Sequence, residues 1–235
     1  MNTSQAPASD PDVLRRILRN TEVLLLDFDG PICSVFSGIP ARYVARQLRD
    51  ILANEGHIDL PAEIGKTGDP FDHLHYAATL GPEQARYVEA ALRAYEIEAV
   101  VSAEPTPGAH ELMRTWSSIR GKVGIVSNNS EAAVSTYLRL HDLVGVVRLI
   151  SARTQADPLL LKPDGHLVEQ AIRAMGVEPI LCTLVGDSIS DIQAAKAVGV
   201  RSIGYINKKW KWSTLASAAP DALTSSITHL IDFTK

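Results

Sequence analysis

Two scarcities limit what this chain can be: it has few cysteines and no long apolar run. Its 235 residues include only two cysteines, Cys33 and Cys182. Both lie in apolar stretches, and together they form neither a disulfide framework nor a zinc-ligand pattern. This usage is typical of a reducing compartment, so we expect a cytoplasmic protein. No apolar run approaches the roughly 20 residues that a membrane-spanning helix needs, so we expect no membrane partner.

An excess of charge of one sign is also missing. The formal net charge is −4 at pH 7, which argues against nucleic acid or an acidic surface as a partner. A local exception is the basic and aromatic segment NKKWKW at 207–212. It resembles a small nucleic-acid or membrane-surface patch. We instead expect a loop that rims a site or packs on its neighbour, and therefore no nucleic acid partner.

The first residues lack the apolar core of a signal peptide. Residues 1–20 begin with the polar stretch MNTSQAPASDPD. We therefore expect a flexible leader and no export. The sequence pattern is compatible with a monomer and with a homodimer.

The sequence does contain an alternation of strand-like and helix-like segments. Amphipathic segments with helical spacing separate short apolar runs. These runs are nearly continuous, as in strands buried on both faces, and they lie at 23–27, 122–127, 146–151, 180–187 and 200–206. The alternation predicts an α/β fold with a Rossmann-like, doubly wound parallel sheet and helices on both faces.

Residues 34–104 interrupt this alternation, because they offer helical patterns without a strand-like run. We therefore expect an inserted helical module at 34–104 and a core domain made of 21–33 and 105–235. The chain length fits one domain with a sizeable insertion. A glycine-rich break in the insertion carries Lys66, which is a candidate for binding an anionic substrate; a flexible surface turn is the alternative.

Several predicted strands end on a reactive side chain. The first ends at Asp27, the second at Ser127 and the fourth at Asp187. In an open parallel sheet, ligands bind beyond the carboxyl ends of the strands, where the winding direction reverses. If the first and fourth strands are neighbours there, Asp27 and Asp187 meet, and packed carboxylates need a compensating cation. An all-oxygen site of this kind suits Mg²⁺.

Asp29 and Lys162 complete a pattern typical of phosphoryl transfer. Gly30-Pro31 ends the first strand, so the chain can aim Asp27 and Asp29 differently, as a nucleophile and an acid–base partner require. Lys162 is the natural counter-charge for both a carboxylate and a phosphate. Ser127 and the backbone N–H groups after it are placed to bind phosphate oxygens at a helix N-terminus.

Four segments together resemble the four motifs of the haloacid dehalogenase (HAD) superfamily in their usual order. They are DFDGPI, VSNNS, LKPDG and GDSISD, and they span residues 27–191. The insertion resembles the helical cap of the phosphoglycolate phosphatase and β-phosphoglucomutase branch. One departure is Pro31, where the family most often has Thr or Val. We expect it to stiffen the turn and to leave the chemistry intact.

The resemblance implies a role for each motif residue. Asp27 would be the nucleophile that forms an aspartyl-phosphate. Asp29 would protonate the leaving group and then activate water. Ser127 and Lys162 would bind the phosphoryl group.

For the metal, the resemblance implies Mg²⁺ held by Asp187, a carboxylate oxygen of Asp27 and the backbone carbonyl of Asp29. Asp191 would support the metal directly or through water, although it also fits a first-turn helix acid. These roles predict a Mg²⁺-dependent phosphatase acting on a small phosphorylated metabolite. Two alternatives stay open: a phosphomutase of the same fold, and a non-catalytic HAD-fold protein that binds a partner.

Overall fold

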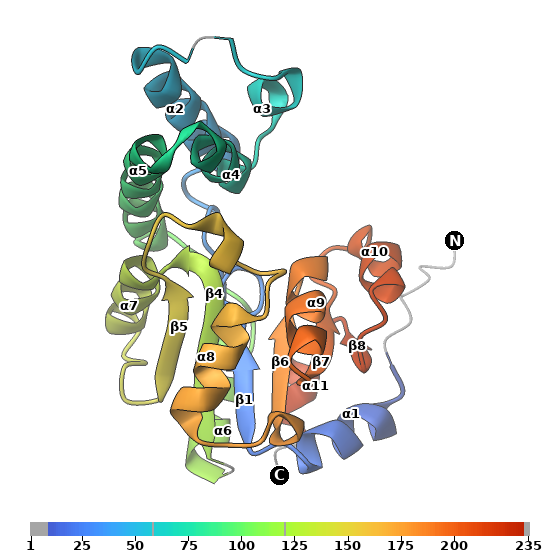
Figure 1. The fold of residues 1–235 in the computed structure, drawn as a ribbon. Helices are drawn as coiled ribbons and strands as arrows, with labels where there is room; N and C mark the ends of the chain where they lie inside the picture. Colours follow the sequence, from blue (N-terminus) through green and yellow to red (C-terminus); the bar gives the residue numbers. More distant parts are fainter. Residues whose placement is uncertain (1–8, 58, 120, 233–235) are drawn as a thin grey trace, which may run out of the picture.

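A computed structural model of the chain describes residues 9–57, 59–119 and 121–232. Its centre is a sheet of six strands that all run parallel (Figure 1). In order across the sheet, the strands are β5 (Leu149–Arg153), β4 (Lys122–Ser130), β1 (Val23–Leu26), β6 (Cys182–Gly186), β7 (Arg201–Tyr205) and β8 (Ala222–Thr224). The predicted doubly wound α/β fold is confirmed.

The winding direction of the sheet reverses next to β1. The chain first builds outward from β1 through β4 to β5, and then crosses to β6 and builds outward through β7 to β8. Leu26 pairs with Ile125 of β4 on one side and with Val185 of β6 on the other. The loops that follow β1 and β6 therefore diverge at the point where such sheets bind ligands.

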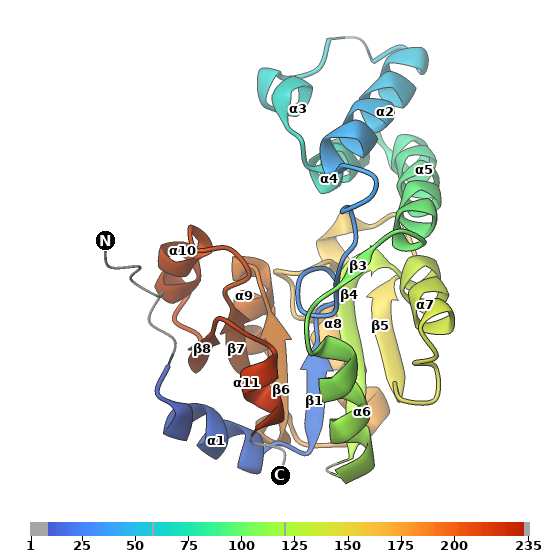
Figure 2. The same cartoon turned by 180° about the vertical axis from the view of Figure 1, so that it is seen from behind.

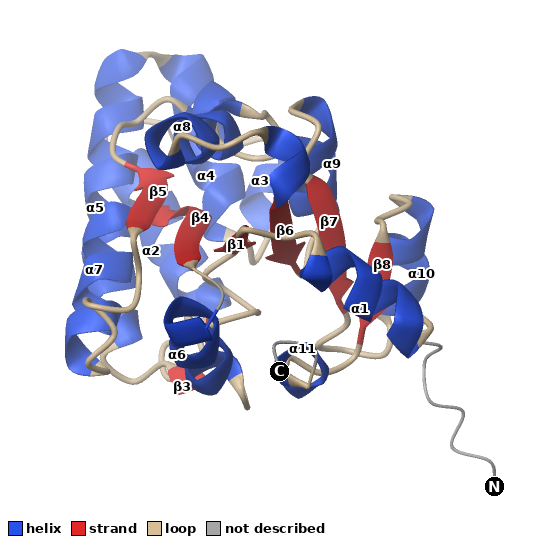
Figure 3. Cartoon of the chain, turned by 90° about the horizontal axis from the view of Figure 1, so that it is seen from below, coloured by secondary structure: helices blue, strands red, loops and turns tan. Residues whose placement is uncertain are grey.

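Helices cover both faces of the sheet (Figure 3). On one face lie α8 (His166–Met175) and α9 (Ile189–Ala197); on the other lie α1 (Pro11–Arg19), α6 (Ala109–Ile119), α7 (Glu131–Leu140) and α11 (Thr228–Ile231). Strand β1 is buried between them: Val23 and Leu25 join the α8 side, while Leu24 and Leu26 join the other. This two-sided burial explains the continuous apolar run of the strand.

Part of the predicted flexible leader is an ordered helix, which corrects that prediction. Helix α1 begins at Pro11, a favoured first helical residue, and the Asp10 side chain accepts from the Asp12 N–H at 2.9 Å. Leu14, Ile17 and Leu18 are buried against the core. Their i, i+3, i+4 spacing marks one helical face, a signal that the polar start of the sequence concealed. Residues 1–8 lie outside the described part of the chain.

Two strand predictions were wrong in detail. The run predicted at 146–151 starts as a turn, because the N–H groups of Val146 and Val147 donate to Leu143 O at 3.0 and 3.2 Å. The strand itself begins only at Leu149. Strand β8 was missed because it has three residues, too few for an apolar pattern to stand out.

The insertion is a helical cap above the carboxyl ends of the strands (Figure 2). Its helices are α2 (Ala41–Asn54), α3 (Ala62–Lys66), α4 (Pro70–Leu80) and α5 (Pro82–Val100). The two connections to the core pair with each other as short antiparallel strands, β2 (Cys33–Ser34) and β3 (Glu104–Pro105). Within the described ranges, no helix combines the length and apolar character needed to cross a membrane.

Candidate active site

The sheet brings three predicted acids together at its switch point. Asp27 follows β1, and its N–H donates to Val185 O of β6 at 2.9 Å. Asp187 follows β6, and Asp191 lies in the first turn of α9. Carboxylate oxygens of these three residues lie within 4.8 Å of one another. Three acids this close repel one another, and their oxygen atoms suit a hard divalent cation such as Mg²⁺.

Two glycines allow this close approach. Gly30 has a φ of +103°, and a Cβ there would lie 2.5 Å from Asp187 Cγ. At Gly186 a Cβ would lie 2.3 Å from Asp191 Cγ. Both positions therefore need glycine for space, and Gly30 needs it for its backbone conformation as well. The glycines of the DFDG and GDS patterns are there because Gly30 packs against Asp187 and Gly186 packs against Asp191.

Lys162 is the buried counter-charge of the site. Its Nζ lies 2.8 Å from Asp27 Oδ1 and 2.5 Å from Asp191 Oδ1, and it also donates to Val126 O at 3.0 Å. Burial alone would lower the pKa of this ammonium group, but the attraction of Asp191 and Asp27 outweighs it and raises the pKa. Lys162 therefore stays charged against the nucleophile candidate.

Opposing electrostatic effects act on the pKa of Asp27. Burial, with repulsion from Asp191 and Asp187, raises its pKa to about 8, while Lys162 opposes the rise. Oδ1 accepts from the Phe28 N–H at 2.7 Å as well as from Lys162. Among the described residues, Oδ2 is the oxygen that carries no such bond. A cation beside Asp27 and Asp187 would favour the ionised carboxylate that can attack.

Asp191 has both carboxylate oxygens engaged by the protein. Oδ1 forms an ion pair with Lys162 Nζ, while Oδ2 accepts hydrogen bonds from Ser188 N at 3.0 Å and from Ser188 Oγ at 2.6 Å. With Ser188 it forms a capping box at the start of α9. The first-turn helix acid considered from the sequence is therefore present, and it also orients Lys162.

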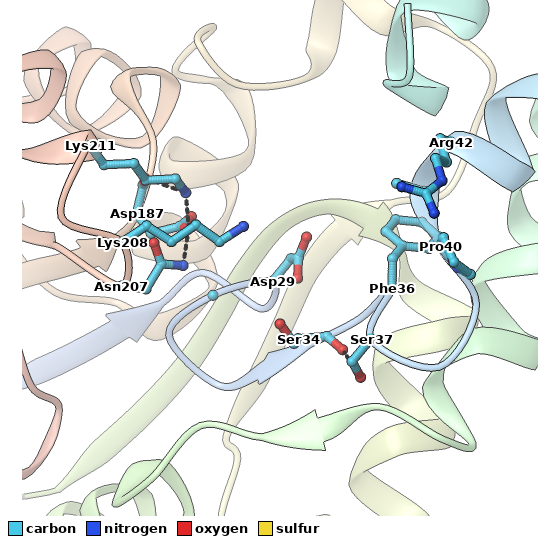
Figure 4. A pocket seen from close by; sticks show the side chains of 12 residues that line it. Asp29, Ser34, Phe36, Ser37, Pro40, Arg42, Asp187, Asn207, Lys208 and Lys211 are labelled. Carbon is cyan, nitrogen blue, oxygen red and sulfur yellow. Dashed lines mark hydrogen bonds and ion pairs between the residues drawn. The ribbon is translucent and has the colours of Figure 1, made fainter.

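Asp29 occupies a different environment from Asp27. Its Oδ1 accepts from the Val35 N–H at 2.9 Å, and its side chain lines a cavity of about 530 Å³ below the cap (Figure 4). Burial raises the pKa of Asp29 to about 6. A carboxyl group with a pKa near the working pH exchanges a proton readily, as an acid–base catalyst must.

The carboxyl end of β4 is tied to Lys162. Asn128 Oδ1 accepts from Lys162 N at 2.8 Å, and Asn128 Nδ2 donates to Lys162 O at 2.9 Å. Ser127 is buried, and its hydroxyl lies 3.2 Å from both the N–H and Oδ1 of Asn129. Ser130 caps α7. The two candidate phosphate-binding segments are thus fixed to each other, by an asparagine that the sequence analysis did not single out.

The basic and aromatic loop rims the site, one of the two placements expected from the sequence. Asn207 Nδ2 donates to Asp187 Oδ2 at 2.6 Å. Lys211, at the start of α10 (Lys211–Ser217), donates to Asp187 O at 3.2 Å and pairs with Asp187 Oδ2. Lys208 lines the same cavity, and Arg42 of the cap lies on its opposite side (Figure 4). The sequence singled out the segment 207–212, but no sequence signal indicated which of its residues contact Asp187 or line the cavity.

Lys66 is the predicted site residue that the structure does not bring to the catalytic acids. It ends α3 in the cap and lines a second cavity. The catalytic cavity is lined by other residues. Arg42 and Arg46 of α2 are both exposed, yet they line cavities as well.

This fold and site define a class of protein. The model of the haloacid dehalogenase-like hydrolases matches residues 21–199, so the chain belongs to that family and is a hydrolase. It is 26% identical over 180 residues to the phosphoglycolate phosphatase of Synechococcus elongatus, covering 69% of this chain and 81% of that protein. It is 28% identical over 145 residues to that of Aquifex aeolicus, covering 62% of this chain and 66% of that protein.

Solved structures show the same fold. A haloacid dehalogenase-like hydrolase from Streptococcus pneumoniae has a TM-score of 0.67 at 15% identity, covering 92% of this chain and all (100%) of that one. A predicted phosphoglycolate phosphatase from Haemophilus somnus has a TM-score of 0.64 at 16% identity, covering 92% and 99%. At such identities the likeness concerns the fold alone.

Proposed function

We propose that the protein is a Mg²⁺-dependent phosphatase that hydrolyses a small phosphorylated metabolite through an aspartyl-phosphate. The observation that carries this proposal is the cluster of Asp27, Asp187 and Asp191, of which Asp27 and Asp191 pair with buried Lys162, while Asp29 lines the adjoining cavity. The names of the phosphoglycolate phosphatases to which the chain is similar support phosphoryl chemistry.

The protein's own groups divide the work of the reaction. Lys162 and the Ser127 loop bind phosphoryl oxygens, and Asp27 Oδ2 attacks phosphorus as the ester bond breaks. Asp29 gives its proton to the leaving oxygen, then takes one from the water that cleaves the acyl phosphate. Mg²⁺, held by Asp27, Asp187 and the Asp29 carbonyl, would supply charge neutralisation at the phosphoryl oxygens.

The cap explains why a small substrate is proposed. It stands over a cavity of about 530 Å³, which is within the usual range for small-molecule sites. Closure of the cap would exclude bulk water while Asp27 is phosphorylated. A cytoplasmic location and a monomeric or homodimeric state remain predictions from the sequence.

The test is phosphate release from p-nitrophenyl phosphate and a panel of phosphorylated metabolites, with Mg²⁺ and with EDTA. We expect release with Mg²⁺, loss of release in EDTA, and loss in a folded Asp27→Asn variant. Chromatography of the products separates hydrolysis from transfer to a second hydroxyl, so an isomerised phosphosugar would favour the mutase. Folded protein without turnover on any ester would favour the non-catalytic alternative and contradict the proposal.

A further inference from the structure

The cap contains a second cavity that adjoins the catalytic one. It has a volume of about 460 Å³, and Pro40 and Arg42 belong to the linings of both cavities. Beyond Arg42 its lining includes Arg46 and Arg49 of α2 and Lys66 of α3. The second cavity therefore leads from the edge of the catalytic cavity into the cap, along a wall of cationic side chains.

The three arginines form one stripe along α2. Positions 42, 46 and 49 are spaced i, i+4 and i+7, which places them on one face of the helix. At 1.5 Å per residue, the stripe is about 10 Å long. Arg49 Nη1 donates to Gly65 O at 2.5 Å, which ties α2 to the segment that presents Lys66. The four cationic side chains thus line one cavity, and they come from two helices, α2 and α3, that are hydrogen-bonded to each other.

The positive charge of this surface is uncompensated. Among the described residues, none of Arg42, Arg46, Arg49 and Lys66 lies within ion-pair distance of a carboxylate. Arg46 instead lies over the Tyr43 ring, 5.3 Å from its centroid. Like charges gathered without a counter-charge repel one another, and an anionic ligand removes that cost.

We propose that the substrate carries a second phosphate group, which binds this cationic cavity while the first is hydrolysed at Asp27. The inference rests on the proposed function and names its substrate class. A carboxylate has one negative charge and two oxygens, so one bidentate arginine satisfies most of it. Three guanidinium groups and an ammonium group offer far more donors, as a phosphate dianion with three free oxygens can use.

The experiment compares a sugar bisphosphate, the matching sugar monophosphate and phosphoglycolate as substrates. The test variant is Arg46→Met with Lys66→Met. The control is Arg86→Met, which removes an exposed charge from α5 of the same cap, outside the lining of either cavity. We expect kcat/KM to favour the bisphosphate over the monophosphate by at least about tenfold, the scale of one charged hydrogen bond. The double variant loses most of this preference, whereas the control keeps it.

The outcomes separate this inference from the proposed function. If the wild-type protein hydrolyses p-nitrophenyl phosphate but prefers the monophosphate or phosphoglycolate, the inference alone is overturned. An equal loss of preference in the control also overturns it. If the wild-type protein hydrolyses nothing, the proposed function fails, and calorimetry with the bisphosphate decides the inference. Weaker binding by the double variant would then support the cationic site, and equal binding would overturn it.

Discussion

Asp27 and Asp29 are two residues apart and yet accept hydrogen bonds and ion pairs from different partners. Asp27 is held by Lys162 among other acids, whereas Asp29 accepts from the Val35 N–H and faces the catalytic cavity. The chain turns at Gly30, directly after Asp29, and Thr106 Oγ1 fixes this turn by donating to Gly30 O at 2.6 Å. Two carboxylates in unlike environments can take the unlike roles of nucleophile and acid.

The acid role of Asp29 predicts a dependence on the leaving group. Asp29→Asn should lower the rate of phosphoryl transfer by about 10²-fold to 10⁴-fold for an alkyl phosphate, which needs a proton on departure. The loss should be much smaller for p-nitrophenyl phosphate, whose leaving group is stable as an anion. Single-turnover rates on both esters provide the measurement. Equal losses on the two esters would contradict the acid assignment.

At the residue scale, the motif acids were predictable and their partners were not. Asp27, Ser127 and Asp187 follow apolar strands directly, so local pattern and sheet topology together place them. Lys162 does not directly follow a strand, and it was singled out as the counter-charge that the predicted acids need. Asn207 and Arg42 come from a loop and a cap helix whose approach to the site depends on tertiary packing, and no local spacing encodes it.

Helix α5 links the cap to the carboxyl end of β4, the candidate phosphate-binding segment. It packs with α2 and α4 in the cap and with α7 in the core. Buried Glu96 accepts from Ser130 N at 2.9 Å and Asn129 Nδ2 at 3.1 Å, and it pairs with Arg153 Nη2 at 2.6 Å. Arg153 also binds Glu89 of α5 at 2.6 Å and Asn128 O at 3.1 Å. This network holds the base of the cap to the site.

Glu96→Gln tests whether the network stabilises the fold. The substitution keeps the side chain's shape but breaks a fully buried ion pair, which should lower the free energy of unfolding by about 3 kcal/mol. Glu169→Gln, which breaks the exposed pair with Arg173 on α8, is the matched control and should cost no more than about 0.5 kcal/mol. Urea denaturation measures both. Equal losses would show that the buried network contributes no more than a surface pair.

Elements were predictable in proportion to the length and regularity of their pattern. The long helices of the cap have a clear helical period and the buried strands have continuous apolar runs, so their existence follows from the sequence. Helix α1 has only nine residues next to a polar start, and β2 and β3 have two residues each. The pairing of β2 with β3 depends on the return of the chain from the cap, and no local sequence signal encodes that return.

The molecule joins the sheet to the inserted cap through the paired strands β2 and β3 and through the packing of α5 on α7. The sheet gathers residues from β1, β4, β6 and the loop before α8 at one edge, although they are far apart in the sequence. The cap adds cations above that edge, from Arg42 onward. In the proposed function, the chemistry belongs to the core and the selection of substrate to the cap, which is why the motifs predict the reaction and leave the substrate open.

The central claim is that Asp27 attacks phosphorus, and the most direct measurement is to trap the phosphorylated residue. Wild-type protein is mixed with radiolabelled p-nitrophenyl phosphate and Mg²⁺, quenched in acid during the first turnover, digested and mapped. We predict an acid-stable, hydroxylamine-sensitive label on the peptide that contains Asp27, and no label in Asp27→Asn. A label on another residue, or turnover by Asp27→Asn at the wild-type rate, would contradict the account.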